Sequence, residues 1–208
     1  LETQEALDEA LTLKKGEVFS NEKIQATQES LRNLYTKQGY LDTNVSYELV
    51  PAKDHSFNVV YNIEESDKCK VGLIVVTGNK RTNNNVIYNN IEITPGETFD
   101  SSKMKETQQR LQSTGHFKHV NVYAVKSDDA ISSDSQYRNV CVEVEENRTA
   151  SFHLSAGANS TANIFGEVSF RESNFNIEGF RDFWADGLKS FRGGGQFLDL
   201  RANVAEKE

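Results

Sequence analysis

The chain has few of the residues that hold small folds together covalently or through metal ions. It has two cysteines, Cys69 and Cys141, among 208 residues, which is too few for a disulfide-rich scaffold or a cysteine-based zinc site. A single disulfide between them stays open, because it requires a Cα separation below about 7 Å that a sequence does not give. We therefore predict no metal site and no cofactor.

Positive charge is also scarce. Lys and Arg number 23 against 31 Asp and Glu, and the formal net charge is −8. Nucleic acid binding needs a basic face, so nucleic acid is excluded as a partner. No apolar run reaches the roughly 18 residues of a membrane-spanning helix. The chain opens with an amphipathic stretch at Leu1 rather than a secretion signal, and we expect it to begin inside a longer protein.

Catalytic motifs are missing as well. No G-x-S-x-G sequence is present, and Gly193–Gly195 lacks the Lys-Ser/Thr that follows a phosphate-binding loop, so it is interpreted as a turn. His116 and His119 have no cysteine or acid at ligand spacing and are expected to face solvent. The paired acids at 64–65 and 145–146 end predicted strands in matching positions, which favours a structural interpretation. We predict no catalytic residue and no enzyme.

The most informative feature is a repeat. Residues 16–31 read GEVFSNEKIQATQESL and residues 96–111 read GETFDSSKMKETQQRL. The identical positions are Gly16/Gly96, Glu17/Glu97, Phe19/Phe99, Lys23/Lys103, Thr27/Thr107, Gln28/Gln108 and Leu31/Leu111. A repeat of this length indicates one structural module used twice.

Each copy contains a predicted helix followed by two strands. Ser20 and Asp100 are the expected helix N-caps, and in the first copy Ile24, Thr27, Leu31 and Leu34 form the expected buried stripe. In the second copy a β-branched run over 71–76 predicts an opening strand, and a further helix is expected through Val86, Ile87 and Ile91. The complete module is thus β-α-α-β-β, and the first copy lacks its opening strand.

Beyond residue 149 the pattern changes to strict alternation of apolar and polar residues, as in Phe152-His153-Leu154-Ser155. Three such segments have about the 9–11 residues of a membrane-spanning strand, although a soluble sandwich alternates in the same way. The 176–195 segment is longer and more aromatic than a tight turn. Its Phe180, Phe183 and Trp184 are consistent either with an interfacial aromatic girdle or with a small core inside the loop.

Three segments in this order resemble the BamA-type outer-membrane assembly factors: residues 75–82, residues 95–117 and residues 144–152. The resemblance implies an α+β fold with two tandem β-α-α-β-β POTRA domains, followed by antiparallel strands of a truncated outer-membrane β-barrel. The domains are expected at residues 1–67 (penultimate POTRA domain), 68–148 (last POTRA domain) and 149–208 (first barrel strands).

The resemblance also implies a function without covalent chemistry, namely insertion of other β-barrel proteins into the bacterial outer membrane, with the POTRA domains in the periplasm. The implied partners are unfolded outer-membrane protein clients, accessory periplasmic lipoproteins and outer-membrane lipid. Clients and lipoproteins would add to a sheet edge by β-augmentation. The expected edge residues are Val120, Asn121, Val122, Tyr123, Ala124 and Val125 in the second copy, and Val45, Ser46 and Tyr47 in the first.

Two further roles follow from the resemblance. Asn147, Arg148, Thr149 and Ala150 would form the hinge between the last POTRA domain and the barrel. Phe152, Leu154, Ala156 and Gly157 would belong to a weak lateral seam strand, because small residues make few cross-strand contacts.

Competing interpretations stay open for each of these assignments. The edge segments are equally consistent with internal strands whose backbone groups are already paired within their own sheet. The hinge and seam residues are likewise consistent with an ordinary linker and an ordinary edge strand. As a whole, the chain is also consistent with a two-partner-secretion type POTRA-barrel transporter or a periplasmic repeat scaffold without a membrane barrel.

Overall fold

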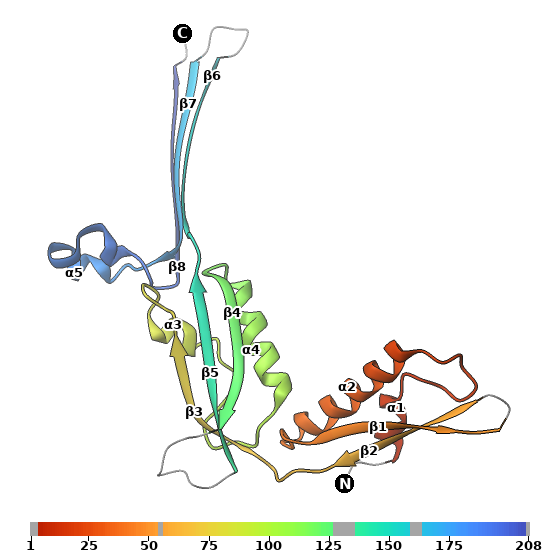
Figure 1. Cartoon of the computed structure of the whole chain (residues 1–208). Coiled ribbons are helices and arrows are strands. Elements are labelled where there is room, and N and C mark those ends of the chain that lie inside the picture. Colours follow the sequence, from red (N-terminus) through yellow and green to blue (C-terminus); the bar gives the residue numbers. More distant parts are fainter. Residues whose placement is uncertain (1–3, 54–55, 127–135, 159–163, 207–208) are drawn as a thin grey trace. The chain divides into compact units, whose positions relative to one another are not determined.

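The computed structural model describes residues 4–53, 56–126, 136–158 and 164–206 (Figure 1). The chain divides into two compact units. The first comprises residues 1–74, 93–105 and 124–140, and the second residues 75–92, 106–123 and 141–208. The division runs through the second repeat, whose three strands each have residues in both units.

The first repeat is built from two helices and a hairpin. Its elements are α1 (Gln4–Ala10), α2 (Asn21–Lys37), β1 (Asn44–Pro51) and β2 (Phe57–Glu64). The predicted N-cap is confirmed, since Ser20 Oγ accepts the backbone N–H of Lys23 at 3.4 Å. After α2 the chain turns at Gly39, whose φ is +99°. Residues other than glycine rarely adopt this backbone conformation. β1 and β2 then pair antiparallel, with Val45 opposite Ile63.

The buried stripe of α2 differs from the predicted one at a single position. Ile24, Thr27 and Leu31 are buried as expected, but Tyr35 rather than Leu34 continues the stripe. Residues four apart lie over one another on a helix, so after Leu31 the buried face comes to Tyr35. Leu34 is half-buried, at the margin of that face.

The second repeat contains the complete module. Its elements are β3 (Lys70–Thr77), α3 (Asn84–Tyr88), α4 (Ser101–Ser113), β4 (Phe117–Lys126) and β5 (Tyr137–Glu146). The expected order β-α-α-β-β is confirmed, with the strands arranged β3-β5-β4. The expected helix through Ile91 is wrong, because α3 ends at Tyr88. The amides of Asn90 and Ile91 bond to carbonyls three residues back, which is a tightened turn rather than continued α-helix.

The core of this module forms around its middle strand. Val140, Val142 and Val144 of β5 are all buried, as are Phe99 and Leu111. Every second residue of a strand points to the same face, so the three valines form one continuous apolar surface.

Among the described helices, none is long and apolar enough to cross a membrane.

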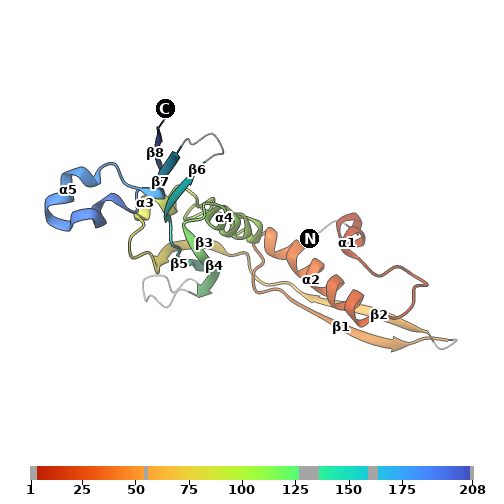
Figure 2. The same cartoon turned by 90° about the horizontal axis from the view of Figure 1, so that it is seen from above.

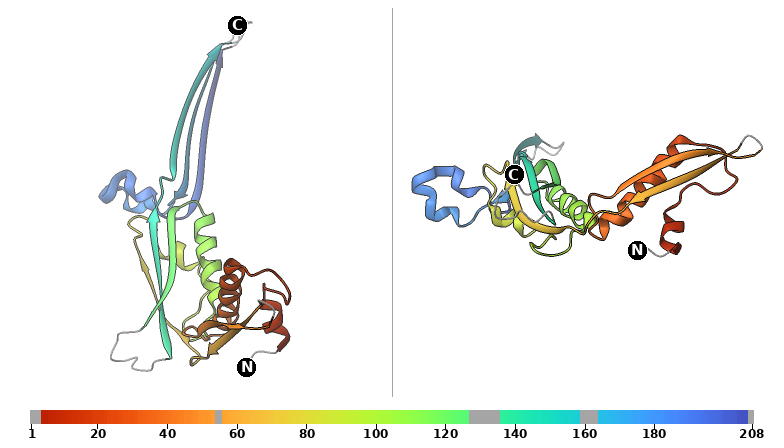
Figure 3. Two further views of the ribbon diagram at one scale, coloured as in Figure 1. Left: turned by 45° about the vertical axis from the view of Figure 1, so that its right-hand side comes forward. Right: turned by 60° about the horizontal axis from the view of Figure 1, so that its bottom comes forward.

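A third sheet follows, in which β6 (Ala150–Ala158), β7 (Ile164–Phe175) and β8 (Gln196–Glu206) pair antiparallel in the order β6-β7-β8. The predicted alternating segments are therefore strands. Between β7 and β8, α5 (Gly179–Asp186) and the 3₁₀-helix η1 (Gly187–Phe191) lie to the side of the base of the sheet in two perpendicular views (Figures 1 and 2). The three strands run side by side (Figure 3), and over the described residues the sheet is open.

Candidate functional site: sheet edges, a junction and a two-faced sheet

The second-repeat residues expected to receive a partner strand lie in β4. The order β3-β5-β4 places β4 on the outside of its sheet, with β5 as its neighbour. Val120 and Val122 point into the core, whereas Asn121 and Tyr123 are exposed. A strand added to β4 would therefore meet its backbone and these alternate exposed side chains, and not the two valines.

The first-repeat residues lie in β1, which pairs with β2 alone in its two-stranded sheet. β1 corresponds to β4, since each follows the long helix of its module. Val45 is buried and Ser46 exposed, while the ring of Tyr47 lies 6.5 Å from that of its cross-strand partner Tyr61. Both predicted edge segments thus occupy outer strands of the described sheets.

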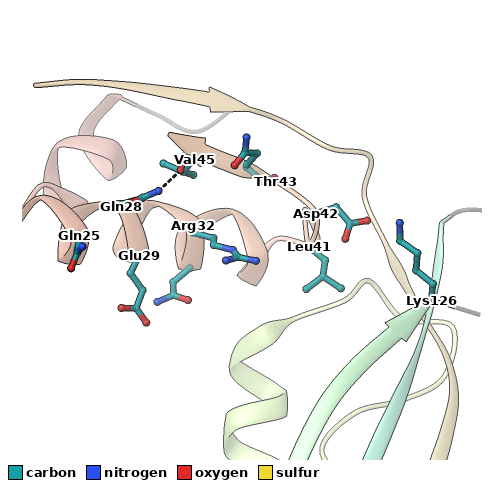
Figure 4. A pocket seen from close by; sticks show the side chains of 11 residues that line it. Gln25, Gln28, Glu29, Arg32, Leu41, Asp42, Thr43, Val45 and Lys126 are labelled. Carbon is teal, nitrogen blue, oxygen red and sulfur yellow. Dashed lines mark hydrogen bonds between the residues drawn. The ribbon is translucent and has the colours of Figure 1, made fainter. Parts of the chain in front are cut away.

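A polar groove of about 800 Å³ accompanies the start of β1 (Figure 4). The Gln28 side chain donates to the carbonyl oxygen of Val45 within it. On its rim, Asp42 pairs with the buried guanidinium of Arg138. The residues that line the groove are Gln25, Gln28, Glu29, Arg32, Asn33, Leu41, Asp42, Thr43, Asn44, Val45 and Lys126. Amide and charged groups suit the polar backbone of an extended peptide better than an apolar ligand.

Hydrogen bonds hold most of the four residues of the expected hinge in place. The N–H of Asn147 donates to the carbonyl of His116 at 2.8 Å, and the N–H of Ser173 donates to the carbonyl of Thr149 at 3.2 Å. Ala150 is already the first residue of β6 and pairs with Glu172. The connection between β5 and β6 is therefore short and hydrogen-bonded at both ends.

A junction of polar groups, buried at Thr82 and Asn174, was missed from the sequence. One carboxylate oxygen of Glu146 accepts the backbone N–H groups of Arg81, at 2.7 Å, and Thr82, at 2.6 Å. The Thr82 hydroxyl in turn accepts from the side chain of Asn174 in β7 at 2.9 Å, and both residues are buried. The second acid of the 145–146 pair thus fastens the turn after β3, rather than merely ending a strand.

Glycine 193 belongs to the same junction. Its N–H donates to the carbonyl of Asn174 at 2.7 Å, and its carbonyl accepts the N–H of Asn83 at 2.9 Å. A β-carbon at this position would collide with the carbonyl of Arg81, and its φ is +97°. The run Gly193–Gly195 was the available sequence signal, because glycine is required where two backbones approach closely.

The expectation that His116 faces solvent is wrong, while His119 is exposed as expected. His116 is buried, and its Nδ1 has no hydrogen-bond partner among the described residues. Burial lowers the pKa of His116, and the carboxylate of Glu172 opposes this only in part. Glu172 is itself buried, and its Oε2 lies 3.4 Å from the Arg192 guanidinium.

The β6-β7-β8 sheet has two chemically distinct faces. Cross-strand partners point to the same face. On one face the rows are Phe152–Phe170–Leu200 and Leu154–Val168–Ala202; on the other they are Ser151–Arg171–Asp199, His153–Ser169–Arg201 and Ser155–Glu167–Asn203. Within the polar face Asp199 pairs with both Arg171, at 3.0 Å, and Arg201, at 2.9 Å.

The expected seam residues lie in β6, which is an outer strand paired with β7. Phe152, Leu154 and Ala156 are exposed, and Gly157 is half-buried.

The disulfide left open by the sequence is not formed, since Cys69 and Cys141 are both free thiols. Cys69 is buried, and this burial raises the pKa of its thiol.

Comparison with known families decides the class of the chain. The family model described as "POTRA: Surface antigen variable number repeat" matches residues 2–66 and 69–147. The chain belongs to this POTRA family. Its α+β repeat fold is confirmed, and so is the resemblance seen in the sequence. Membership of this family also confirms the expectation that the chain is not an enzyme.

The curated relatives are distant but cover most of the chain. "Outer membrane protein assembly factor BamA" of Neorickettsia risticii is 26% identical over 168 residues, which are 81% of this chain and 22% of the relative. The protein of the same name from Neisseria meningitidis serogroup B is 26% identical over 152 residues, 73% of this chain and 19% of the relative. The chain thus spans about a fifth of the length of these relatives.

Solved structures show the same fold. BamA from Haemophilus ducreyi lacking POTRA domains 1–3 matches with a TM-score of 0.72 at 16% identity, over 98% of this chain and 36% of that one. Haemophilus influenzae BamA POTRA3-5 matches with a TM-score of 0.61 at 15% identity, over 67% of this chain and 54% of that one.

Proposed function

We propose that the chain is the membrane-proximal part of an outer-membrane β-barrel assembly factor of a Gram-negative bacterium. Its two POTRA repeats would lie in the periplasm, and residues 150–206 would supply the first strands of a barrel in the outer membrane. The observation that carries this proposal is the two-faced β6-β7-β8 sheet, directly after the second POTRA repeat.

The apolar face of that sheet supports contact with lipid. The strands have 9, 12 and 11 residues, close to the length that crosses a bilayer when tilted. A soluble sandwich would bury its apolar face against a second sheet, whereas Phe152, Leu154 and Leu200 are exposed. The opposite face, with Arg171, Asp199 and Arg201, suits a polar barrel interior.

The POTRA repeats would recruit partners through β4 and β1. An outer strand offers unpaired N–H and C=O groups, and pairing with them tolerates many sequences. That tolerance suits a protein that receives many unfolded outer-membrane clients, and accessory periplasmic lipoproteins would use the same mode of binding. The outer strand β6 would act as the lateral seam that templates a client strand, and residues 147–150 would set its orientation to the second POTRA repeat.

Site-specific photo-crosslinking in cells tests the edge assignment. A photoreactive residue at Asn121 or Tyr123 of β4 is expected to crosslink to unfolded clients or periplasmic lipoproteins. Glu143 is the matched control, because it is also exposed but lies on β5, the middle strand of the same sheet. Equal crosslinking from all three positions would contradict binding by strand addition.

A further inference from the structure

The segment between β7 and β8 forms a small fold of its own. The ring of Phe191 lies at its centre, 5.9 Å from Phe175, 4.8 Å from Phe180 and 5.6 Å from Phe183. The sequence left open whether its aromatic residues form a loop core or a membrane-facing group. Phe183 is 37% exposed and its ring lies between those of Phe191, at 5.6 Å, and Trp184, at 5.8 Å, whereas Trp184 itself is 92% exposed.

Hydrogen bonds at its base fix the segment. The N–H of Asn176 donates to the carbonyl of Phe191 at 2.8 Å, and the side-chain amide of Asn176 donates to the carbonyl of Ser190 at 3.1 Å. Gly179 packs so closely on the backbone of Ser190 that a β-carbon would collide with it. The N–H of Ile177 also donates to Oε1 of Gln196 in β8 at 2.8 Å, which joins the start of the segment to the base of the sheet.

That outer surface carries an apolar stripe. Ile177 is 57% exposed, Phe180 67%, Trp184 92% and Leu188 78%. Phe180 and Trp184 are four residues apart in α5 and lie on the same side of it, whereas Ile177 precedes α5 and Leu188 lies in η1, after Gly187 with its φ of +60°. Asp182, two residues before Trp184, lies about half a turn away and is also exposed. An exposed row of large apolar side chains beside charged ones is typical of a surface that meets another phase or partner.

The stripe lies at the end of the sheet that adjoins the POTRA repeat. Ala150, at the start of β6, pairs with Glu172 near the end of β7, and Phe175 pairs with Gln196. Along β8 the half-buried Leu198 and the exposed Leu200 follow soon after Gln196. The stripe is thus close to where the apolar face of the sheet begins, and lipid is the partner that would contact both.

We propose that the α5–η1 segment is an interfacial membrane anchor in the periplasmic leaflet. The inference rests on the proposed function, which places this end of the sheet at the periplasmic boundary of the outer membrane. Trp and other aromatic side chains favour the headgroup region of bilayers, and amphipathic helices lie there with their apolar side in the acyl boundary. Ile177, Phe180, Trp184 and Leu188 contact lipid, while Asp182 stays in water.

Trp184 makes a direct test available, because it is the only tryptophan of the 208-residue chain. The chain is mixed with vesicles of phosphatidylethanolamine and phosphatidylglycerol, with acyl chains either unmodified or brominated close to the headgroups. We expect a blue shift of Trp184 emission, a loss of intensity with brominated lipid, and protection from iodide. Emission that stays iodide-accessible and unaffected by bromine overturns the inference, and protection that appears only on addition of periplasmic protein assigns the stripe to a protein partner instead.

Two variants serve as controls. In the Trp184→Phe/Asp182→Trp variant the tryptophan is expected to remain accessible to iodide, and quenching equal to that of Trp184 overturns the proposed orientation. In the Trp184→Phe/Leu154→Trp variant the tryptophan reports on the apolar face of the sheet. Quenching at position 154 without quenching of Trp184 refutes the anchor and leaves the membrane sheet standing; the converse result supports the anchor and refutes the membrane sheet.

Discussion

Phe19 and Phe99 occupy the same position in the two copies of the repeat, yet one is 54% exposed and the other 1% exposed. The difference arises from β3. The N–H of Phe99 donates to the carbonyl of Cys69 at 2.9 Å, and the N–H of Val71 to the carbonyl of Glu97, also at 2.9 Å. In the described part of the first copy no strand pairs with residues 16–19, and the ring of Phe19 lies 6.5 Å from that of Phe57.

Other shared residues behave alike in both copies. Glu17 pairs with Lys23, and Glu97 with Lys103, each at 2.6 Å. The buried hydroxyls of Thr27 and Thr107 accept backbone N–H groups fifteen residues earlier, from Thr12 and Glu92. These contacts are therefore common to both copies, including those made to Thr12 and Glu92 outside the copied segment, whereas burial of Phe19 and Phe99 differs with the presence of a neighbouring strand.

The largest effect is expected from truncating the buried phenylalanine. Phe99→Ala should destabilise the second repeat by about 3–5 kcal/mol, because it removes a large buried ring and leaves a cavity. Phe19→Ala is the matched control and should cost much less. Hydrogen exchange of the amides of α4 and α2 measures each repeat separately. Equal losses would show that β3 does not cause the difference in burial.

A smaller effect is expected at the acids that end the corresponding strands. Glu146→Ala should cost about 2–3 kcal/mol, because two backbone N–H groups lose a charged acceptor. Its counterpart Glu65 is exposed, and Glu65→Ala should have little effect. Urea unfolding of both variants checks the comparison, and a loss at Glu65 as large as that at Glu146 would contradict the role of Glu146 in the junction.

A somewhat smaller loss of stability is expected at Thr27 and Thr107, the threonines that the two copies share. Thr27→Val and Thr107→Val should each cost about 1–2 kcal/mol, since each leaves a backbone N–H without its acceptor at nearly unchanged volume. Thermal or urea unfolding with the same hydrogen-exchange readout would test this. A loss confined to one repeat would show that the two copies do not share this interaction.

The smallest effect on stability is expected at Glu17 and Glu97, which form ion pairs with Lys23 and Lys103. The Lys23 side chain lowers the pKa of Glu17 through a hydrogen bond. Burial pushes the pKa of Glu97 upward, but hydrogen bonds from Lys103 and the Thr94 N–H outweigh it, and the net shift is also downward. A carboxyl group whose pKa is lowered by folding stabilises the folded protein at pH values above the pKa that the group has in the unfolded chain. This stabilisation is lost as the pH falls through the pKa of the folded state.

Carbon NMR titration of the two carboxyl groups should find both pKa values below the ordinary glutamate range. Lys103→Met should raise the pKa of Glu97 and Lys23→Met that of Glu17, because each change removes the hydrogen bond and the charge that lower the pKa. Values that do not move in either variant would show that the two ion pairs are absent in solution.

Much of the fold was accessible from the sequence because it depends on local rules. The caps at Ser20 and Asp100, the β-α-α-β-β order and the alternating strands after residue 149 were predicted and are present. Two errors were local, because α3 ends at Tyr88 and Tyr35 takes the place predicted for Leu34. A third error arose where neighbours outside the segment decide the outcome. His116 is buried, and its carbonyl accepts the N–H of Asn147, which lies 31 residues later in the chain; no local pattern signals that approach.

By itself, the sequence determined that one module is used twice, which positions form most of the buried stripe of α2, and that three segments after residue 149 alternate between two faces. Tertiary structure alone decided which phenylalanine of the pair is covered, that Glu146, Thr82, Asn174 and Gly193 meet at one junction, and that Phe183 packs beside Phe191 while Trp184 stays exposed. The reason is physical: periodicity and capping act within a few residues, whereas burial and polar junctions arise only when segments distant in sequence come into contact.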